Sequence, residues 1–208
     1  MGRGLLVRVR DFILFLFLSL FHNGLEMIVF CCKDMENDLT VQELVRMPTS
    51  VVPDFSLKGM TTWGRVVDVY DGDTMTVILP LLGFYYKFKV RLTGIDTCEI
   101  KSKIEENKTK AYRARNRVIQ LCAPSCPLLR TMEERIPKKE VQEFFSKYPS
   151  IIWVKCGEFD KYGRLLCEAH TGPTAPESIC AILIREKLAY PYFGDTKMTE
   201  LEQSSLMV

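Results

Sequence analysis

Residues 86–93 alternate without a break between apolar and polar side chains, which is typical of a β-strand buried on one face. The apolar positions are Tyr86, Phe88, Val90 and Leu92, and the polar positions are Lys87, Lys89, Arg91 and Thr93. Because successive side chains of a strand point to opposite faces, the first set is expected to enter a core and the second to meet solvent or a ligand. The chain is therefore expected to fold around a β-sheet.

Four further runs rich in β-branched and aromatic residues predict the other strands. Residues 64–70 and 74–79 are separated by Asp-Gly-Asp, and Asp-Gly between two such runs is a strong hairpin signal. Residues 151–155 and 164–169 predict two more strands, joined by a turn that contains Gly157 and Gly163.

Helical periodicity appears between the third and fourth strands and again after the fifth. In residues 105–122, one helix face carries Ala111, Ala114, Val118 and Leu121. A short helix is predicted over 138–148, and a capping box at Thr174 and Glu177 predicts a helix through about Lys187. Together these elements predict a mainly β, α+β fold, namely a five-stranded OB-fold barrel with two to three helices.

The pattern also divides the chain into segments. These are a hydrophobic N-terminal segment at 1–32, a linker at 33–62 with a short helix near 39–46, the barrel domain at 63–192, and a C-terminal tail at 193–208. Ordered structure is expected from about Trp63, and the tail is expected to be frayed.

The N-terminal segment has the composition of a targeting sequence. Three arginines precede residues 12–21, in which Ser19 is the only residue that is not apolar. This is typical of a signal peptide, whereas a full membrane span would need roughly 20 apolar residues. An uncleaved anchor, and a translation start at Met27 or later, stay open as alternatives. A signal peptide or an uncleaved anchor predicts secretion or membrane association through residues 12–32. A translation start at Met27 or later predicts a cytosolic or nuclear protein.

Composition and charge limit the classes of function. With 47% hydrophobic and 26% charged residues, the chain is an ordinary globular protein. Its net charge of +2 gives no overall reason to expect nucleic acid as a partner. The charge is uneven, however, because residues 84–118 hold ten Lys and Arg against four Asp and Glu. This local excess indicates a surface that attracts phosphates.

The cysteines do not form a recognisable metal or redox motif. Eight are present without paired Cys-x-x-Cys motifs, and there are only two histidines, so a structural zinc site is poorly supported. An even number of cysteines would allow disulfides in a secreted protein, but their spacing is not that of a compact disulfide scaffold. Free and mostly buried thiols are expected.

Three short segments place charged residues where the sheet pattern does not require them. The first is Asp-Gly-Asp-Thr at 71–74, the second runs from 91 to 99, and the third is Asp-Lys-Tyr-Gly-Arg at 160–164. Taken one at a time, each is explained by a turn or by a solvated strand end with a surface ion pair.

Taken together, the three segments hold the groups needed to hydrolyse a phosphodiester. A carboxylate after the third strand, close to a hairpin carboxylate, suits a hard divalent cation such as Ca²⁺. Arg91 and Arg164 each offer a planar, permanently charged guanidinium to a phosphate. The cation and the arginines would stabilise negative charge at phosphorus, while a further carboxylate deprotonates the attacking water.

In their order and their placement on strands, these segments resemble the staphylococcal nuclease (thermonuclease) family of OB-fold nucleases. Residues 183–190, Leu-Ile-Arg-Glu-Lys-Leu-Ala-Tyr, are similar to the last helix of that family. The resemblance covers about Trp63 to Tyr192, and the ordered set is specific although each motif alone is weak. It implies a calcium-dependent endonuclease that acts on DNA and RNA and leaves 3′-phosphate ends.

The resemblance also implies a role for each residue of the site. The implied calcium ligands are Asp73, Asp96 and the backbone carbonyl of Thr97, with Asp71 in support. The implied general base is Glu99, and the implied phosphate-binding residues are Arg91 and Arg164. The residues implied to face the nucleotide are Tyr162 and Tyr190 or Tyr192, which fits base stacking on aromatic side chains.

The chain departs from the family pattern in three places. Cys98 stands where the family usually has a proline, which loosens the turn that carries Glu99. Lys187 replaces a glycine common near the end of the last helix, at a cost of about 1 kcal/mol if the backbone is left-handed there. An insertion at 123–149 separates the first helix from the fourth strand, where the family is short.

The alternative hypothesis is a catalytically inactive OB-fold module that binds nucleic acid or protein. A decayed site should have lost some of the five charged residues, yet all are present: Asp73, Arg91, Asp96, Glu99 and Arg164. The sequence therefore favours an active nuclease, expected to be a monomer with DNA and RNA as its substrates.

Overall fold

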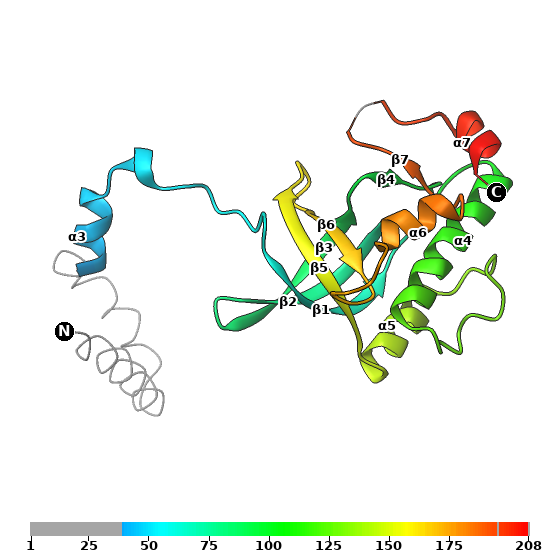
Figure 1. Ribbon diagram of the computed structural model, residues 1–208, viewed down its shortest axis with the longest axis horizontal. Helices are drawn as coiled ribbons and strands as arrows, with labels where there is room; N and C mark the ends of the chain where they lie inside the picture. Colours follow the sequence, from blue (N-terminus) through cyan, green and yellow to red (C-terminus); the bar gives the residue numbers. More distant parts are fainter. Residues whose placement is uncertain (1–38, 195, 208) are drawn as a thin grey trace, which may run out of the picture. The chain divides into compact units, whose positions relative to one another are not determined.

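The structure is a computed structural model that describes residues 39–194 and 196–207 (Figure 1). It divides into two compact units, Met1–Asp54 and Phe55–Val208. In the first unit, the described residues form α3 (Leu39–Arg46), which confirms the predicted short helix, and a 3₁₀ helix, η1 (Thr49–Val51). The segment at 1–32, for which a targeting or anchoring role is predicted, lies outside the described residues. Within the described part of the chain, no helix is long and apolar enough to cross a membrane.

A closed five-stranded barrel forms the centre of the second unit, with the strand order β1-β2-β3-β6-β5. Its strands are β1 (Thr61–Val69), β2 (Thr74–Leu81), β3 (Phe84–Leu92), β5 (Ser150–Phe159) and β6 (Leu165–His170). Neighbouring strands are antiparallel except β3 and β6, which run parallel. The predicted fold class, an α+β protein with an OB-fold-like barrel, is confirmed.

Ordered structure begins earlier than the predicted Trp63. Leu57 is buried in the core, and Gly59 N and Met60 O exchange hydrogen bonds of 2.9 and 2.8 Å with Cys156. These contacts extend the pairing of β1 with β5 by several residues. They depend on a strand distant in sequence, so no local sequence pattern predicts them.

The alternation of β3 is confirmed only where the strand lies in the barrel wall. Val90 and Leu92 are each 1% exposed and enter the core. Tyr86 was expected in the core but is 48% exposed, because the β2–β3 hairpin extends beyond the barrel (Figure 1). Phe88, at the transition, is half-buried with its ring centroid 6.4 Å from that of Phe159.

Gly157 was expected in the turn between the last two barrel strands, but it lies within β5. The pairing of β5 with β6 shifts register between Cys156 and Phe159, and a Cβ on Gly157 would lie 3.1 Å from the carbonyl oxygen of Leu166. The glycine therefore serves a strand irregularity, and the turn itself occupies 160–164.

The helix α4 (Glu105–Cys122) has the predicted bounds and buries Ala114 and Val118 in the barrel core, while Ala111 is buried in a smaller cluster with Cys98, Tyr190 and Met207. By contrast, α6 (Ile179–Arg185) begins later than predicted. Its N-cap is Ser178, whose hydroxyl accepts a 3.1 Å hydrogen bond from the backbone of Ala181. The capping box at Thr174 is wrong because Pro176 disfavours a helical backbone at the residue before it.

Beyond α6, the chain turns at Lys187, whose φ of 55° is left-handed as anticipated. The backbone N–H of Leu188 donates to Leu183 O at 2.8 Å, and that of Lys187 donates to Ile184 O at 2.9 Å. This pair of bonds is the Schellman arrangement, which satisfies carbonyls at the helix end.

The insertion at 123–149 is part of the core. Its helix α5 (Lys138–Lys147) packs on β1, with Val141 fully buried and Phe145 1% exposed. The loop before α5 is held by α4, where Arg115 Nη1 donates to Ile136 O at 2.7 Å and Asn116 Nδ2 donates to Met132 O at 2.9 Å.

The tail beyond Tyr192 was expected to fray, but it returns to the domain. β4 (Ile95–Asp96) pairs with β7 (Tyr190–Pro191), and α7 (Glu200–Leu206) packs on α4. α7 is opened by a capping box between Thr199 and Glu202, and Asn107 Nδ2 donates to Glu200 O at 2.8 Å. That capping box was readable in the sequence.

Six of the eight cysteines are described, and all six are free and buried, as predicted. Burial raises the pKa of the thiols of Cys122 and Cys180 to about 12. Such groups are protonated at neutral pH and behave as small hydrophobic side chains. Cys31 and Cys32 lie outside the described residues.

Candidate active site

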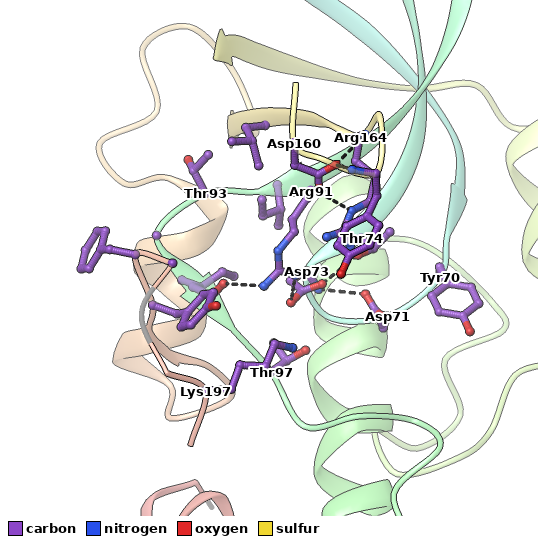
Figure 2. Close-up of a pocket in the computed structure, with 18 of the residues that line it drawn as sticks. Tyr70, Asp71, Asp73, Thr74, Arg91, Thr93, Thr97, Asp160, Arg164 and Lys197 are labelled. Carbon is purple, nitrogen blue, oxygen red and sulfur yellow. Dashed lines mark hydrogen bonds and ion pairs between the residues drawn. The ribbon is translucent and has the colours of Figure 1, made fainter. Parts of the chain in front are cut away.

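A pocket of about 850 Å³ lies on the outer face of the barrel, where the three predicted segments meet a fourth that includes residues 192–194 and 197 (Figure 2). The predicted site residues that line it are Asp71, Asp73, Arg91, Thr97, Glu99, Tyr162, Arg164 and Tyr192. Asp96 and Tyr190 are buried behind this lining. The structure thus brings the charged groups of all three segments to one place.

The turn between β1 and β2 is pressed against the domain at Gly72. A Cβ there would lie 2.7 Å from the Cβ of Ala114 and 2.8 Å from the Cγ2 of Thr97. The glycine is needed for space, whereas the sequence suggested only turn preference. This close approach holds Asp71 and Asp73 at the edge of the pocket (Figure 2).

Arg91 is the centre of the charge network, with its side chain only 11% exposed. Its Nη1 forms an ion pair with Asp73 Oδ2, and its Nη2 lies 2.7 Å from Asp96 Oδ1 and 3.3 Å from the carbonyl oxygen of Ile95. Burial would lower the pKa of Arg91, but the two carboxylates outweigh it and raise that pKa. One guanidinium therefore joins the hairpin carboxylate to the one that follows β3.

Asp96 is 1% exposed, and both of its carboxylate oxygens have donors. Oδ1 accepts from Arg91 and from Lys197 Nζ at 3.0 Å, and Oδ2 accepts from the hydroxyl of Tyr190. Burial acts to raise the pKa of Asp96, but these hydrogen bonds dominate and lower it. The carboxylate is thus ionised and fixed in orientation.

Tyr190, one of the two tyrosines expected to face the nucleotide, does not line the pocket. Its side chain is buried, and its hydroxyl is used to orient Asp96, because β7 pairs directly with β4. Of the two tyrosines considered, Tyr192 is the one that lines the pocket.

Lys197 is a pocket residue that the sequence did not reveal. Its Nζ lies 3.0 Å from Asp96 Oδ1 and 3.2 Å from Glu99 Oε1, so it joins the buried carboxylate to the exposed one. The only signal for it was indirect. The capping box at Thr199 predicts a helix after the barrel strands. If that helix packs on the domain, the residues just before it, including Lys197, also lie close to the domain.

The turn at 160–164 presents Arg164 and Tyr162 to the pocket. Asp160 organises it, since Oδ1 accepts from the backbone N–H groups of Tyr162 and Arg164 at 2.9 Å, and Oδ2 accepts from Arg164 Nε at 2.7 Å. Although slight burial acts to raise it, these bonds lower the pKa of Asp160. The Arg164 guanidinium carbon lies 5.5 Å from the Tyr162 ring centroid, so the two side chains contact each other across the turn.

The donor set beside Arg91 suits a hard cation. Burial, followed by the charge of neighbouring Asp73, raises the pKa of Asp71 to about 8. Asp71 therefore carries a proton at neutral pH, which leaves Asp73 and Asp96 as the charged carboxylates beside Arg91. Within residues 39–194 and 196–207, no group of three or more His, Cys, Asp and Glu side chains is placed to hold a metal ion. A cation here would bind two carboxylates and backbone oxygen, a combination that Ca²⁺ accepts.

Replacement of Gly72 by alanine should destabilise the domain by about 1–3 kcal/mol, because the new methyl group enters space already filled by α4 and Thr97. Denaturant unfolding measures the change. Gly172→Ala is the matched control, since nothing lies within 4 Å of its Cβ position. Equal stability of the two variants would show that the β1–β2 turn is not packed as described.

No family model and no curated protein matches this chain. Its function therefore follows from the chemistry of the pocket and from the ordered motifs that build it.

Proposed function

We propose that the protein is a calcium-dependent endonuclease of the staphylococcal nuclease type, which hydrolyses phosphodiester bonds of DNA and RNA and leaves 3′-phosphate ends. The observation that carries the proposal is the convergence of two arginines and an exposed glutamate, Arg91, Arg164 and Glu99, in one pocket beside the carboxylates of Asp73 and Asp96.

Two guanidinium groups would hold the scissile phosphate. Arg91 has five N–H donors, of which its contacts with Asp73, Asp96 and Ile95 account for three. The remaining N–H donors of Arg91 would bind a phosphate oxygen from β3, and Arg164 would bind the same phosphate from the turn at 160–164. Donors held in place before reaction favour the transition state, where negative charge on the phosphoryl oxygens increases.

Glu99 is the candidate general base. Its side chain is 58% exposed at the mouth of the pocket, so a water molecule can reach its carboxylate. Lys197 Nζ donates to Oε1 at 3.2 Å, which orients the carboxylate of Glu99. Tyr162, which is 72% exposed, and Tyr192 would supply aromatic faces for the bases on either side.

Calcium would be held by Asp73, Asp96 and the backbone carbonyl of Thr97, and when bound it would add positive charge at the phosphoryl oxygens. The aspartates have a second task, because they fix the guanidinium of Arg91.

Digestion of single-stranded DNA and of RNA tests the proposal. The wild type should cleave both in Ca²⁺ and neither in EGTA. Glu99→Gln and Arg164→Ala should each lower kcat/KM by about 10²-fold or more, the usual contribution of a general base or a transition-state charge partner.

The matched controls are Glu143→Gln on α5 and Arg185→Ala on α6, which remove the same groups at exposed positions outside the pocket. These should cleave like the wild type. Activity that is equal in all variants and buffers would contradict the proposal. A wild type that binds oligonucleotides without cleaving them would support the inactive OB-fold module instead.

A further inference from the structure

The outer face of β3 continues from the pocket to the tip of the β2–β3 hairpin. Because Val90 and Leu92 enter the core, the odd-numbered positions of the strand point outward. From the tip to the pocket these are Tyr85, Lys87, Lys89 and Arg91. We call the first three the β3 track. All three side chains are exposed, and Tyr85 is 79% exposed.

The track has the spacing and the charge of a phosphate-binding row. Alternate residues of a strand are about 7 Å apart, which is comparable to the separation of successive phosphates along an extended nucleic-acid strand. On the adjacent strand, Lys89 lies opposite Thr76 and Lys87 lies opposite Ile78. Neither partner is acidic, so the two ammonium groups face solvent beside uncharged side chains.

Aromatic side chains gather where the track ends. Phe84 is 66% exposed, Tyr85 79% and Tyr86 48%. By the alternation of the strand, Tyr85 shares the face of Lys87 and Lys89, whereas Phe84 and Tyr86 point to the opposite face of the hairpin. Exposed rings beside a row of cations are what proteins use to bind single strands, since every base can stack on an aromatic face.

We propose that the β3 track binds the part of a single-stranded substrate that extends beyond the scissile phosphate, with Lys89 and Lys87 on successive phosphates and Tyr85 against a base. The inference rests on the proposed nuclease function, since it takes Arg91 as the place of the scissile phosphate. The track and Arg91 lie on one strand, and Arg91 lines the pocket. A linear row of cations that leads into a pocket fits an extended nucleic-acid strand better than a flat lipid surface.

The track should make recognition depend on substrate length. A dinucleotide would fill the pocket alone, whereas a 12-nucleotide strand would also contact the lysines. Each phosphate contact on a single strand contributes about 0.7 to the slope of log K against log salt, so loss of two lysines should reduce that slope by about 1.4. Over one decade of salt this corresponds to about 25-fold in affinity.

The experiment compares Lys87→Ala/Lys89→Ala with a control that loses the same charge on α5, Lys139→Ala/Lys147→Ala. Fluorescence anisotropy of a labelled 12-nucleotide single-stranded DNA in EGTA measures binding without cleavage. At 0.1 M salt the track variant should bind at least 10-fold more weakly than the wild type. Tyr85→Ala should weaken binding about 5-fold or more, and the control should bind like the wild type.

Cleavage in Ca²⁺ provides the second measurement. The track variant should lose kcat/KM on the 12-nucleotide strand and retain it on a dinucleotide. An equal loss on both substrates, or binding equal to that of the α5 control, would overturn the track. Binding to anionic vesicles that requires Lys87 and Lys89, with oligonucleotide affinity unchanged, would also overturn it. A wild type that cleaves nothing refutes the nuclease, while binding in EGTA still decides the track.

Discussion

Replacement of Arg91 by alanine should reduce kcat/KM by about 10³-fold or more and lower the free energy of unfolding by about 3–5 kcal/mol. The first effect follows from losing a proposed phosphate ligand. The second follows because Asp73 and Asp96, which are 4% and 1% exposed, would lose a partner that is itself buried. Nuclease assays and urea unfolding at pH 7 measure the two effects separately.

Arg91→Lys separates charge from geometry. A lysine keeps one positive charge between the carboxylates but cannot bind both of them and a phosphate with a planar fork. It should recover part of the lost stability while kcat/KM stays low. A fully active Arg91→Lys variant, or an Arg91→Ala variant as stable as the wild type, would contradict the role of the guanidinium.

The stability lost in Arg91→Ala should also depend on pH. The pKa of Asp96 is lowered in the fold, so its contribution is present above the pKa of the unfolded chain and is lost as pH falls through the folded pKa. Without Arg91, the ionised form of Asp96 is less stabilised in the folded protein. The difference between variant and wild type should therefore be greatest at neutral pH and shrink in acid.

Phe145→Ala should destabilise the protein by about 3–5 kcal/mol, as expected for a fully buried aromatic side chain. Phe145 is 1% exposed, and its ring centroid lies 5.3 Å from that of Phe144. Phe145 lies on α5, within the insertion. A loss of global stability of this size would show that α5 unfolds together with the barrel. Denaturant unfolding measures it, with activity recorded under native conditions.

Phe84→Ala is the control for this prediction, because it removes the same side chain from a site that is 66% exposed. Its effect should stay within about 0.5 kcal/mol. If both variants changed stability equally, α5 would be an appendage on β1 and not part of one cooperative core.

The elements that could be predicted are those whose pattern is local. The alternation along β3 and the 3.6-residue period of α4 are each contained in one segment, and both give nearly the observed bounds. The Asp-Gly turn between β1 and β2 is local in the same sense. The barrel follows because these strands must bury one face each.

The elements that failed depend on partners distant in sequence. Tyr86 continues an alternating pattern, yet no second layer covers the hairpin tip. The insertion has a polar appearance, and only its contacts with Arg115 and Asn116 on α4 show that its loop is fixed. In the pocket, motif order placed Arg91 and Asp73 together, but the roles of Tyr190 and Lys197 arise from the pairing of β7 with β4.

The pairing of β7 with β4 sets an order of events during synthesis. All five barrel strands precede Tyr190 in the chain, and translation adds about 5–20 residues per second. The barrel strands are therefore synthesised before the residues that orient Asp96 and contact Glu99. The scaffold is encoded ahead of the segment that completes its pocket, so a chain that ends before Tyr190 would hold every barrel strand and lack these contacts.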